Sequence, residues 1–160
     1  DLDIIVEDLG PLGDVVEDLR RQLGYPGMRV LQEAFVGDPD KQLLPENYSD
    51  DSVVYTGTHD NDTARGRLDS ESERYRQQAL TYTEASPETY PWALISRAWE
   101  SVAVIAIAPM QDLLGLGTGA RMNYPSTTEG NWQWRMAEHV ATSDLARKMA
   151  ELNRKSGRSR

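Results

Sequence analysis

The sequence predicts an α/β fold, and two features of the chain carry this prediction. Short apolar runs rich in β-branched residues alternate with longer amphipathic stretches, as expected of strands and helices packed in layers. Clusters of polar residues follow the apolar runs and do not precede them. This asymmetry is typical of a (β/α) barrel, whose chemistry lies on the loops beyond the carboxyl ends of its strands.

The expected elements can be placed in chain order. They are a strand at 2–6, a helix at 14–23, strands at 28–32 and 53–55, helices at 70–82 and 92–100, a strand within 101–108, and a helix at 143–152. A closed barrel needs eight strands and about 250 residues, so 160 residues with about four strands make roughly half of one. We therefore expect residues 1–153 to form a partial barrel and residues 154–160 to form a disordered basic tail.

Periodicity supports each helix and the last strand. Val15, Leu19 and Leu23 share one face of the first helix, which ends before Gly24. The helix at 70–82 is rich in Glu, Arg and Gln and should have a solvated outer face, whereas the helix at 92–100 should turn its apolar residues inward. The apolar run within 101–108 is uninterrupted, which predicts a strand buried on both faces.

Composition narrows the classes of function. The formal net charge is −9, from 17 Lys and Arg against 26 Asp and Glu, and this argues against nucleic acid as a partner. The longest apolar run is far shorter than the roughly 18–20 residues that span a bilayer, so we expect no membrane segment. There is no cysteine and no secretory signal pattern at residue 1, which fits a cytoplasmic location.

Two polar clusters directly follow predicted strands. Glu7 and Asp8 follow the first strand, and His59 and Asp60 lie in the Thr58–Thr63 run after the third. Paired carboxylates suit glycoside chemistry, in which one acid protonates the leaving oxygen and another carboxylate stabilises the charge on the sugar.

Other interpretations of these clusters stay open at this point. The His59–Asp62 run could ligate a metal through oxygen and nitrogen atoms, although it does not match an EF-hand loop. Each cluster taken alone could also be surface charge, a structural histidine or a turn. The residues alone therefore indicate a sugar hydrolase or transferase, with a metal-binding domain as the rival.

Several longer strings resemble the amylomaltase (disproportionating enzyme, 4-α-glucanotransferase) family, glycoside hydrolase family 77. The matching blocks are 4–10 (IIVEDLG), 24–32 (GYPGMRVLQ), 47–48 (NY), 53–63 (VVYTGTHDNDT), 106–117 (AIAPMQDLLGLG), 121–123 (RMN) and 129–135 (EGNWQWR). The blocks occur in the family's order over most of the chain. The resemblance implies the C-terminal half of a (β/α)8 barrel, with strands 5–8.

The resemblance also implies an activity and a set of roles. The family transfers α-1,4-glucan segments between maltooligosaccharides by a retaining mechanism, without a cofactor or a metal. By this resemblance Glu7 would be the general acid/base and Asp60 the carboxylate that stabilises the transition state. His59 and Asn123 would bind the sugar at the cleavage point, while Asp8 and Asp62 would organise their loops.

The family's nucleophilic Asp lies in an Arg-x-Asp-His-like motif, which is not found among these 160 residues. We therefore expect this chain alone to be inactive, since a retaining enzyme needs a nucleophile. The alternative is a piece that binds glucan without turnover. Open barrel edges would further favour self-association of the isolated chain.

The sequence departs from the family pattern at a few positions. Glu33 stands where an apolar residue is typical and is expected to point to solvent. Arg67 stands where a tryptophan is common, so an aromatic acceptor-side contact is missing. Trp132 and Trp134 could stack on glucose rings or could pin their loop as core residues.

Overall fold

The computed structural model describes residues 3–9, 13–36 and 43–158. Its elements are α1 (Gly13–Leu23), β1 (Gly27–Val30), the 3-10 turns η1 (Leu31–Phe35) and η3 (Pro45–Asn47), β2 (Ser52–Tyr55), α2 (Ala64–Ser70), α3 (Glu73–Thr83), α4 (Tyr90–Glu100), β3 (Ile105–Ile107), α5 (Met110–Leu113), η4 (Thr118–Ala120) and α6 (Ser143–Lys155). The predicted α/β class is confirmed.

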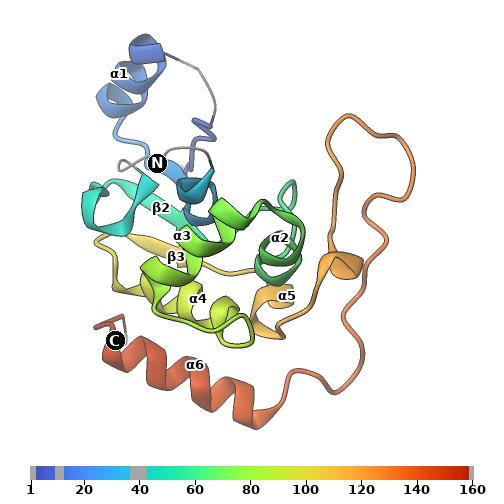
Figure 1. Cartoon of the computed structure of the whole chain (residues 1–160). Coiled ribbons are helices and arrows are strands. Elements are labelled where there is room, and N and C mark those ends of the chain that lie inside the picture. The colour runs from blue at the N-terminus through green and yellow to red at the C-terminus, as the bar shows by residue number, and fades with distance from the viewer. Residues whose placement is uncertain (1–2, 10–12, 37–42, 159–160) are drawn as a thin grey trace.

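The three strands form one parallel sheet in the order β1-β2-β3 (Figure 1). Met28 lies opposite Val53 in the register of β1 and β2, and Val54 lies opposite Ala106 in that of β2 and β3. Because parallel strands end at the same edge, the loops that follow them are brought together there.

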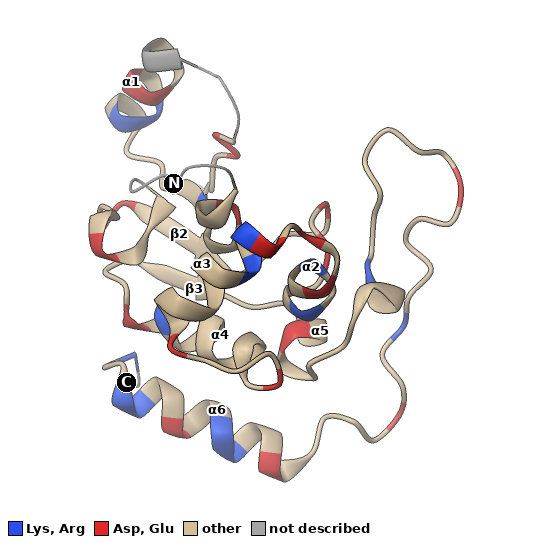
Figure 2. Cartoon of the chain, in the orientation of Figure 1, with Lys and Arg blue, Asp and Glu red and all other residues tan. Residues whose placement is uncertain are grey.

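Helices α2, α3 and α4 stand over one side of the sheet, and the core fills the space between them (Figure 1). On α4 the predicted inward residues Leu94, Ile95 and Ala98 are fully buried. They pack with Phe35 and Val54 in one apolar cluster, which is the main source of stability for this unit. Acidic and basic residues alternate along α6 on the outside (Figure 2).

The strand predicted at 2–6 is not formed in the described part of that segment. Val6 makes a single parallel bridge to Gly27, and its N–H donates to Pro26 O at 3.0 Å. Ile4 and Ile5 are 38% and 41% exposed, because no layer of the described chain packs over them. Residue 2 lies outside the described residues. The segment therefore runs beside β1 with only one strand-like contact.

The strand predicted within 101–108 is shorter and less buried than expected. It comprises Ile105–Ile107, and Val102 and Val104 are 61% and 60% exposed. The prediction of burial on both faces was wrong because β3 is the edge strand of the described sheet and helices cover one side only. The apolar face of α1 at Val15, Leu19 and Leu23 is likewise exposed.

The helical region at 64–83 also differs from the prediction. The helix expected at 70–82 begins at Glu73, because the Ser72 hydroxyl caps it by accepting from Tyr75 N at 3.2 Å. The short helix α2 before it was missed, since Gly66 in its middle masks the helical pattern.

The expected disordered tail at 154–160 also needs correction over its first part. Helix α6 continues through Lys155, and the Arg158 side chain donates to the backbone oxygens of Trp99 (2.7 Å) and Ser101 (2.8 Å). Trp99 Nε1 in turn donates to Asn153 Oδ1 at 2.8 Å. These bonds tie the end of α6 to the end of α4. Residues 159–160 lie outside the described residues.

None of the helices in the described residues has both the length and the apolar character that crossing a membrane requires.

Candidate active site

A large cleft of about 1390 Å³ opens at the carboxyl ends of the strands. Glu7 lines it from the segment beside β1, and His59 and Asp60 line it from the loop after β2. Tyr55, the last residue of β2, lies among them, and its pKa is raised by burial and then by the negative charge of Glu7. Three of the four predicted site residues therefore face one cleft.

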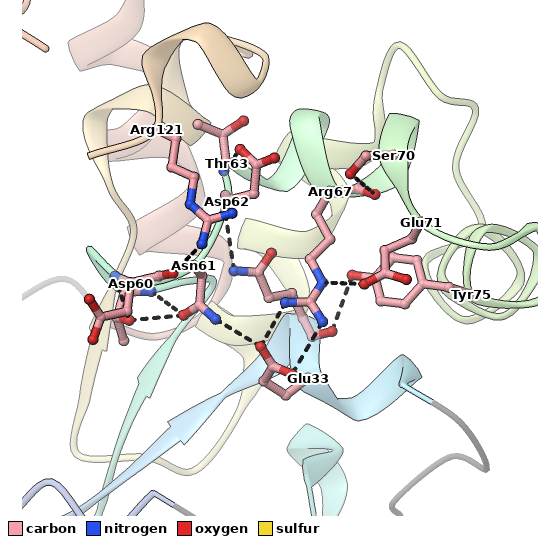
Figure 3. Close-up of polar contacts among 12 residues, drawn as sticks. Glu33, Asp60, Asn61, Asp62, Thr63, Arg67, Ser70, Glu71, Tyr75 and Arg121 are labelled. Carbon is pink, nitrogen blue, oxygen red and sulfur yellow. Dashed lines mark hydrogen bonds and ion pairs between the residues drawn. The ribbon is translucent and has the colours of Figure 1, made fainter. Parts of the chain in front are cut away.

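The fourth predicted residue, Asn123, reaches the same place through Asp60. Asn123 Nδ2 donates to Asp60 Oδ1 at 2.6 Å, and His59 Nε2 lies 3.4 Å from that same oxygen. Arg121 Nη2 donates to the backbone oxygen of Asp60 at 2.7 Å (Figure 3). The Asp60 side chain is 43% exposed. The carboxylate is thus held at one oxygen while the side chain remains accessible from the cleft.

Trp132 packs on the ring of His59, with their centroids 5.0 Å apart and their planes at 37°. Trp132 has a positive φ of 62°, and its N–H donates to Met122 O at 2.7 Å. Its side chain nevertheless stays 53% exposed. Trp132 therefore contacts His59 without being a core residue, and its stacking on a glucose ring stays a prediction.

The loop after β2 is folded around the side chain of Asn61. Asn61 Oδ1 accepts from the backbone N–H of Thr58 at 2.8 Å and from its hydroxyl at 2.9 Å. The Thr58 hydroxyl oxygen also accepts from Asp60 N at 3.3 Å. Asparagine is well suited to closing such a turn on the backbone. These bonds set the direction in which the intervening residues His59 and Asp60 leave the loop.

Asp8 and Asp62, the neighbours of the proposed catalytic carboxylates, are occupied by structural contacts. Asp62 is buried, and its two oxygens accept from Thr63 N and from the Thr118 hydroxyl, both at 2.7 Å. Asp8 accepts from Met28 N at 2.7 Å and lies 3.3 Å from the Nε of the buried Arg20. Both therefore anchor their loops.

A further carboxylate, Asp112 at the end of α5, was not singled out from the sequence. It accepts from the Thr56 hydroxyl at 2.6 Å and from Ala64 N at 2.7 Å, and so ties the end of β2 to the start of α2. Burial raises the pKa of Asp112, and these two hydrogen bonds partly offset the rise. Asp112 follows β3 and lies within a block that resembles the family, and this was the signal by which the sequence could have identified it.

The structure does not favour the metal site. Within the ranges described, no group of three or more His, Cys, Asp or Glu side chains is arranged to hold an ion. The run His59–Asp62 explains why: the Asp60 oxygen faces Asn123, whereas the Asp62 oxygens face Thr63 and Thr118. Carboxylates that point apart cannot share one ion.

Gly66 marks the closest approach between α2 and the segment that supports the loop. A Cβ at this position would lie 2.6 Å from Thr118 N and 2.7 Å from Asp62 Oδ1. Alanine would ordinarily stabilise a helix interior by about 1 kcal/mol over glycine. Here we expect Gly66→Ala to destabilise the protein by about 1–3 kcal/mol, because the backbone of Thr118 must move.

Urea unfolding measures this effect, and Gly119→Ala is the matched control because a Cβ there would meet nothing within 4 Å. Unfolding of the Gly66→Ala protein at an equal or higher urea concentration than the unsubstituted protein would contradict the expected clash.

Comparisons with known proteins all point to one family. A family model described as 4-alpha-glucanotransferase matches residues 1–141. A 4-alpha-glucanotransferase of Clostridium butyricum is 44% identical over 160 residues, which is 99% of this chain and 33% of the relative. A chloroplastic/amyloplastic 4-alpha-glucanotransferase of Oryza sativa subsp. japonica is 47% identical over 152 residues, 94% of this chain and 26% of the relative.

Among solved structures, the amylomaltase from Streptococcus agalactiae in complex with acarbose matches with a TM-score of 0.93 at 31% sequence identity. The match covers 100% of this chain and 33% of that chain. The chain thus spans about a third of the length of the first of these relatives. With the family model matched over 1–141, the chain belongs to the 4-alpha-glucanotransferase family.

Proposed function

We propose that the protein is a 4-α-glucanotransferase that moves α-1,4-glucan segments between maltooligosaccharides with retention of configuration. This chain would form the C-terminal half of its (β/α)8 barrel, with strands 5–8. The observation that carries the proposal is the placement of Asp60, held by Asn123 and beside His59, in a cleft that Glu7 also lines. The family membership supports the same conclusion.

Each residue has a role that its surroundings support. Glu7 is exposed in the cleft, so it can protonate the leaving glycosidic oxygen and later take the proton of the acceptor hydroxyl. Asp60 stabilises the positive charge that develops on the sugar, and Asn123 orients it. His59 donates to the hydroxyls of the sugar at the cleavage point. No cofactor takes part.

The covalent step needs a further carboxylate, besides Glu7 and Asp60, as nucleophile. We propose that it comes from the part of the enzyme outside these 160 residues, since the family's Arg-x-Asp-His-like motif is not among them. This chain alone would then bind glucan without forming the glycosyl-enzyme.

The test uses the chain fused behind the remainder of the Clostridium butyricum relative, a fusion that we call the completed enzyme. With maltotriose as donor and radiolabelled glucose as acceptor, we expect label to enter maltose and longer maltooligosaccharides. Release of glucose and maltose without any product longer than maltotriose would make the protein a hydrolase. Binding of maltotriose without any product would leave a glucan-binding role.

Two further expectations stay predictions: a cytoplasmic location, and self-association of this chain through the open barrel edges.

A further inference from the structure

A chain of polar contacts links helix α2 to the loop that carries His59 and Asp60 (Figure 3). The Arg67 guanidinium donates two hydrogen bonds to the Glu33 carboxylate, from Nη1 to Oε1 at 2.8 Å and from Nη2 to Oε2 at 3.3 Å. Asn61 Nδ2 donates to the same Oε1 at 2.7 Å. A two-pronged guanidinium–carboxylate pair fixes the carboxylate in direction as well as in place.

The position of Glu33 decides which way the Asn61 amide faces. An amide has a donor end and an acceptor end, and Glu33 can only accept. With Nδ2 turned to Glu33, Oδ1 must face Thr58, where it accepts from the backbone N–H and the hydroxyl. Thr58 then accepts from Asp60 N. The carboxylate thereby determines the hydrogen bonding of the whole turn.

Arg67 is itself firmly held. Its side chain is 15% exposed, and its guanidinium lies 5.5 Å from the centre of the Tyr75 ring. Burial is the largest influence on the pKa of Arg67 and lowers it, but Glu33, Tyr75 and Glu71 together raise this pKa above its ordinary value. Glu33, expected to point to solvent, instead turns its 36% exposed side chain to these partners. That expectation was wrong because the partners lie 28 and 34 residues away.

We propose that Glu33 is a positioning residue for Asp60: clamped by Arg67, it orients Asn61 so that the turn at 58–61 presents Asp60 to the glucan. The inference rests on the proposed function.

The first test is Glu33→Met in the completed enzyme, which removes the acceptor without opening a cavity. A catalytic group misplaced by about 1 Å can cost about 100-fold, so we expect kcat to fall about 10- to 100-fold. KM should change less than about threefold, because the contacts that bind substrate remain. Glu33→Gln keeps one acceptor oxygen and should recover part of the loss.

A charge exchange separates the ion pair from the contact to Asn61. Glu33→Arg combined with Arg67→Glu can rebuild the pair, but arginine offers no acceptor to Asn61 Nδ2. We expect this double variant to recover thermal stability relative to Glu33→Arg alone while kcat stays low. The matched control is Arg65→Met, which removes an arginine paired with Asp69 on the outside of the same helix and should leave kcat unchanged.

Hydrogen–deuterium exchange gives a readout that needs no activity. Glu33→Met should raise deuterium uptake in peptides covering 57–62, where Thr58 N loses its acceptor, and Arg65→Met should not. If the completed enzyme itself shows no transfer, the proposed function fails, and this uptake alone decides the positioning role. Raised uptake supports the role, and unchanged uptake overturns it.

With an active completed enzyme, three kinetic results would overturn the inference. The first is no change in either kcat or KM in Glu33→Met. The second is a raised KM with unchanged kcat in Glu33→Met, which would make Glu33 a direct glucan contact. The third is full recovery of kcat in the charge exchange.

Discussion

Replacing Asp60 with asparagine should lower kcat for maltotriose transfer in the completed enzyme by about 1,000-fold. Removing one preorganised electrostatic contact from a transition state costs about 100- to 1,000-fold in well-studied enzymes, and here a full negative charge is lost. The shape of the site should survive, because the asparagine oxygen can still accept from Asn123 Nδ2. The fall in kcat would therefore result from the lost negative charge of Asp60 and not from misfolding.

The control for Asp60→Asn is Asp69→Asn, the same chemical change at a residue whose described partner is Arg65 on the exposed side of α2. It should leave kcat unchanged. An Asp60→Asn enzyme that keeps more than about a tenth of the normal kcat would remove Asp60 from the proposed role.

Replacing Glu7 with glutamine should have an effect that depends on the leaving group. With maltotriose, loss of the general acid should lower kcat about 100- to 10,000-fold. With α-maltosyl fluoride, whose fluoride leaves without a proton, formation of the glycosyl-enzyme should be lowered far less. The measurement is the rate of fluoride release under single-turnover conditions.

Asp60→Asn is the internal comparison for this experiment. It should be slow with both donors, because charge develops on the sugar whichever group leaves. An equal loss with both donors in Glu7→Gln would show that Glu7 is not the proton donor for the leaving group.

The sequence predicted the parts of the fold that depend on local pattern. Strand β2 and helix α4 lie where their apolar spacing places them, with Leu94, Ile95 and Ala98 buried as expected. The two strands predicted at the edges of the described sheet, at 2–6 and within 101–108, were predicted less well. The apolar runs at 2–6 and 101–108 carry strand signals, but pairing partners and covering layers decide whether a strand forms, and these are not local properties.

The same division applies to the site. Local strings marked His59 and Asp60, whereas the contact of Asp60 with Asn123 spans 63 residues and was anticipated only as a shared sugar site through family resemblance. Glu33 shows the limit most clearly. Its contacts with Asn61 and Arg67 arise because η1, the loop after β2 and helix α2 meet in three dimensions, so no spacing within the sequence indicates them.

The central claim is that this chain supplies Glu7 and Asp60 to an active site whose nucleophile comes from the rest of the enzyme. The most direct test measures glucose release from maltotriose by this chain, by the separate remainder of the Clostridium butyricum relative, and by the two together. Glucose released only in the mixture and in the completed enzyme is the predicted result. Glucose released by this chain alone would contradict the claim, and the nucleophile would then have to be sought among its own carboxylates.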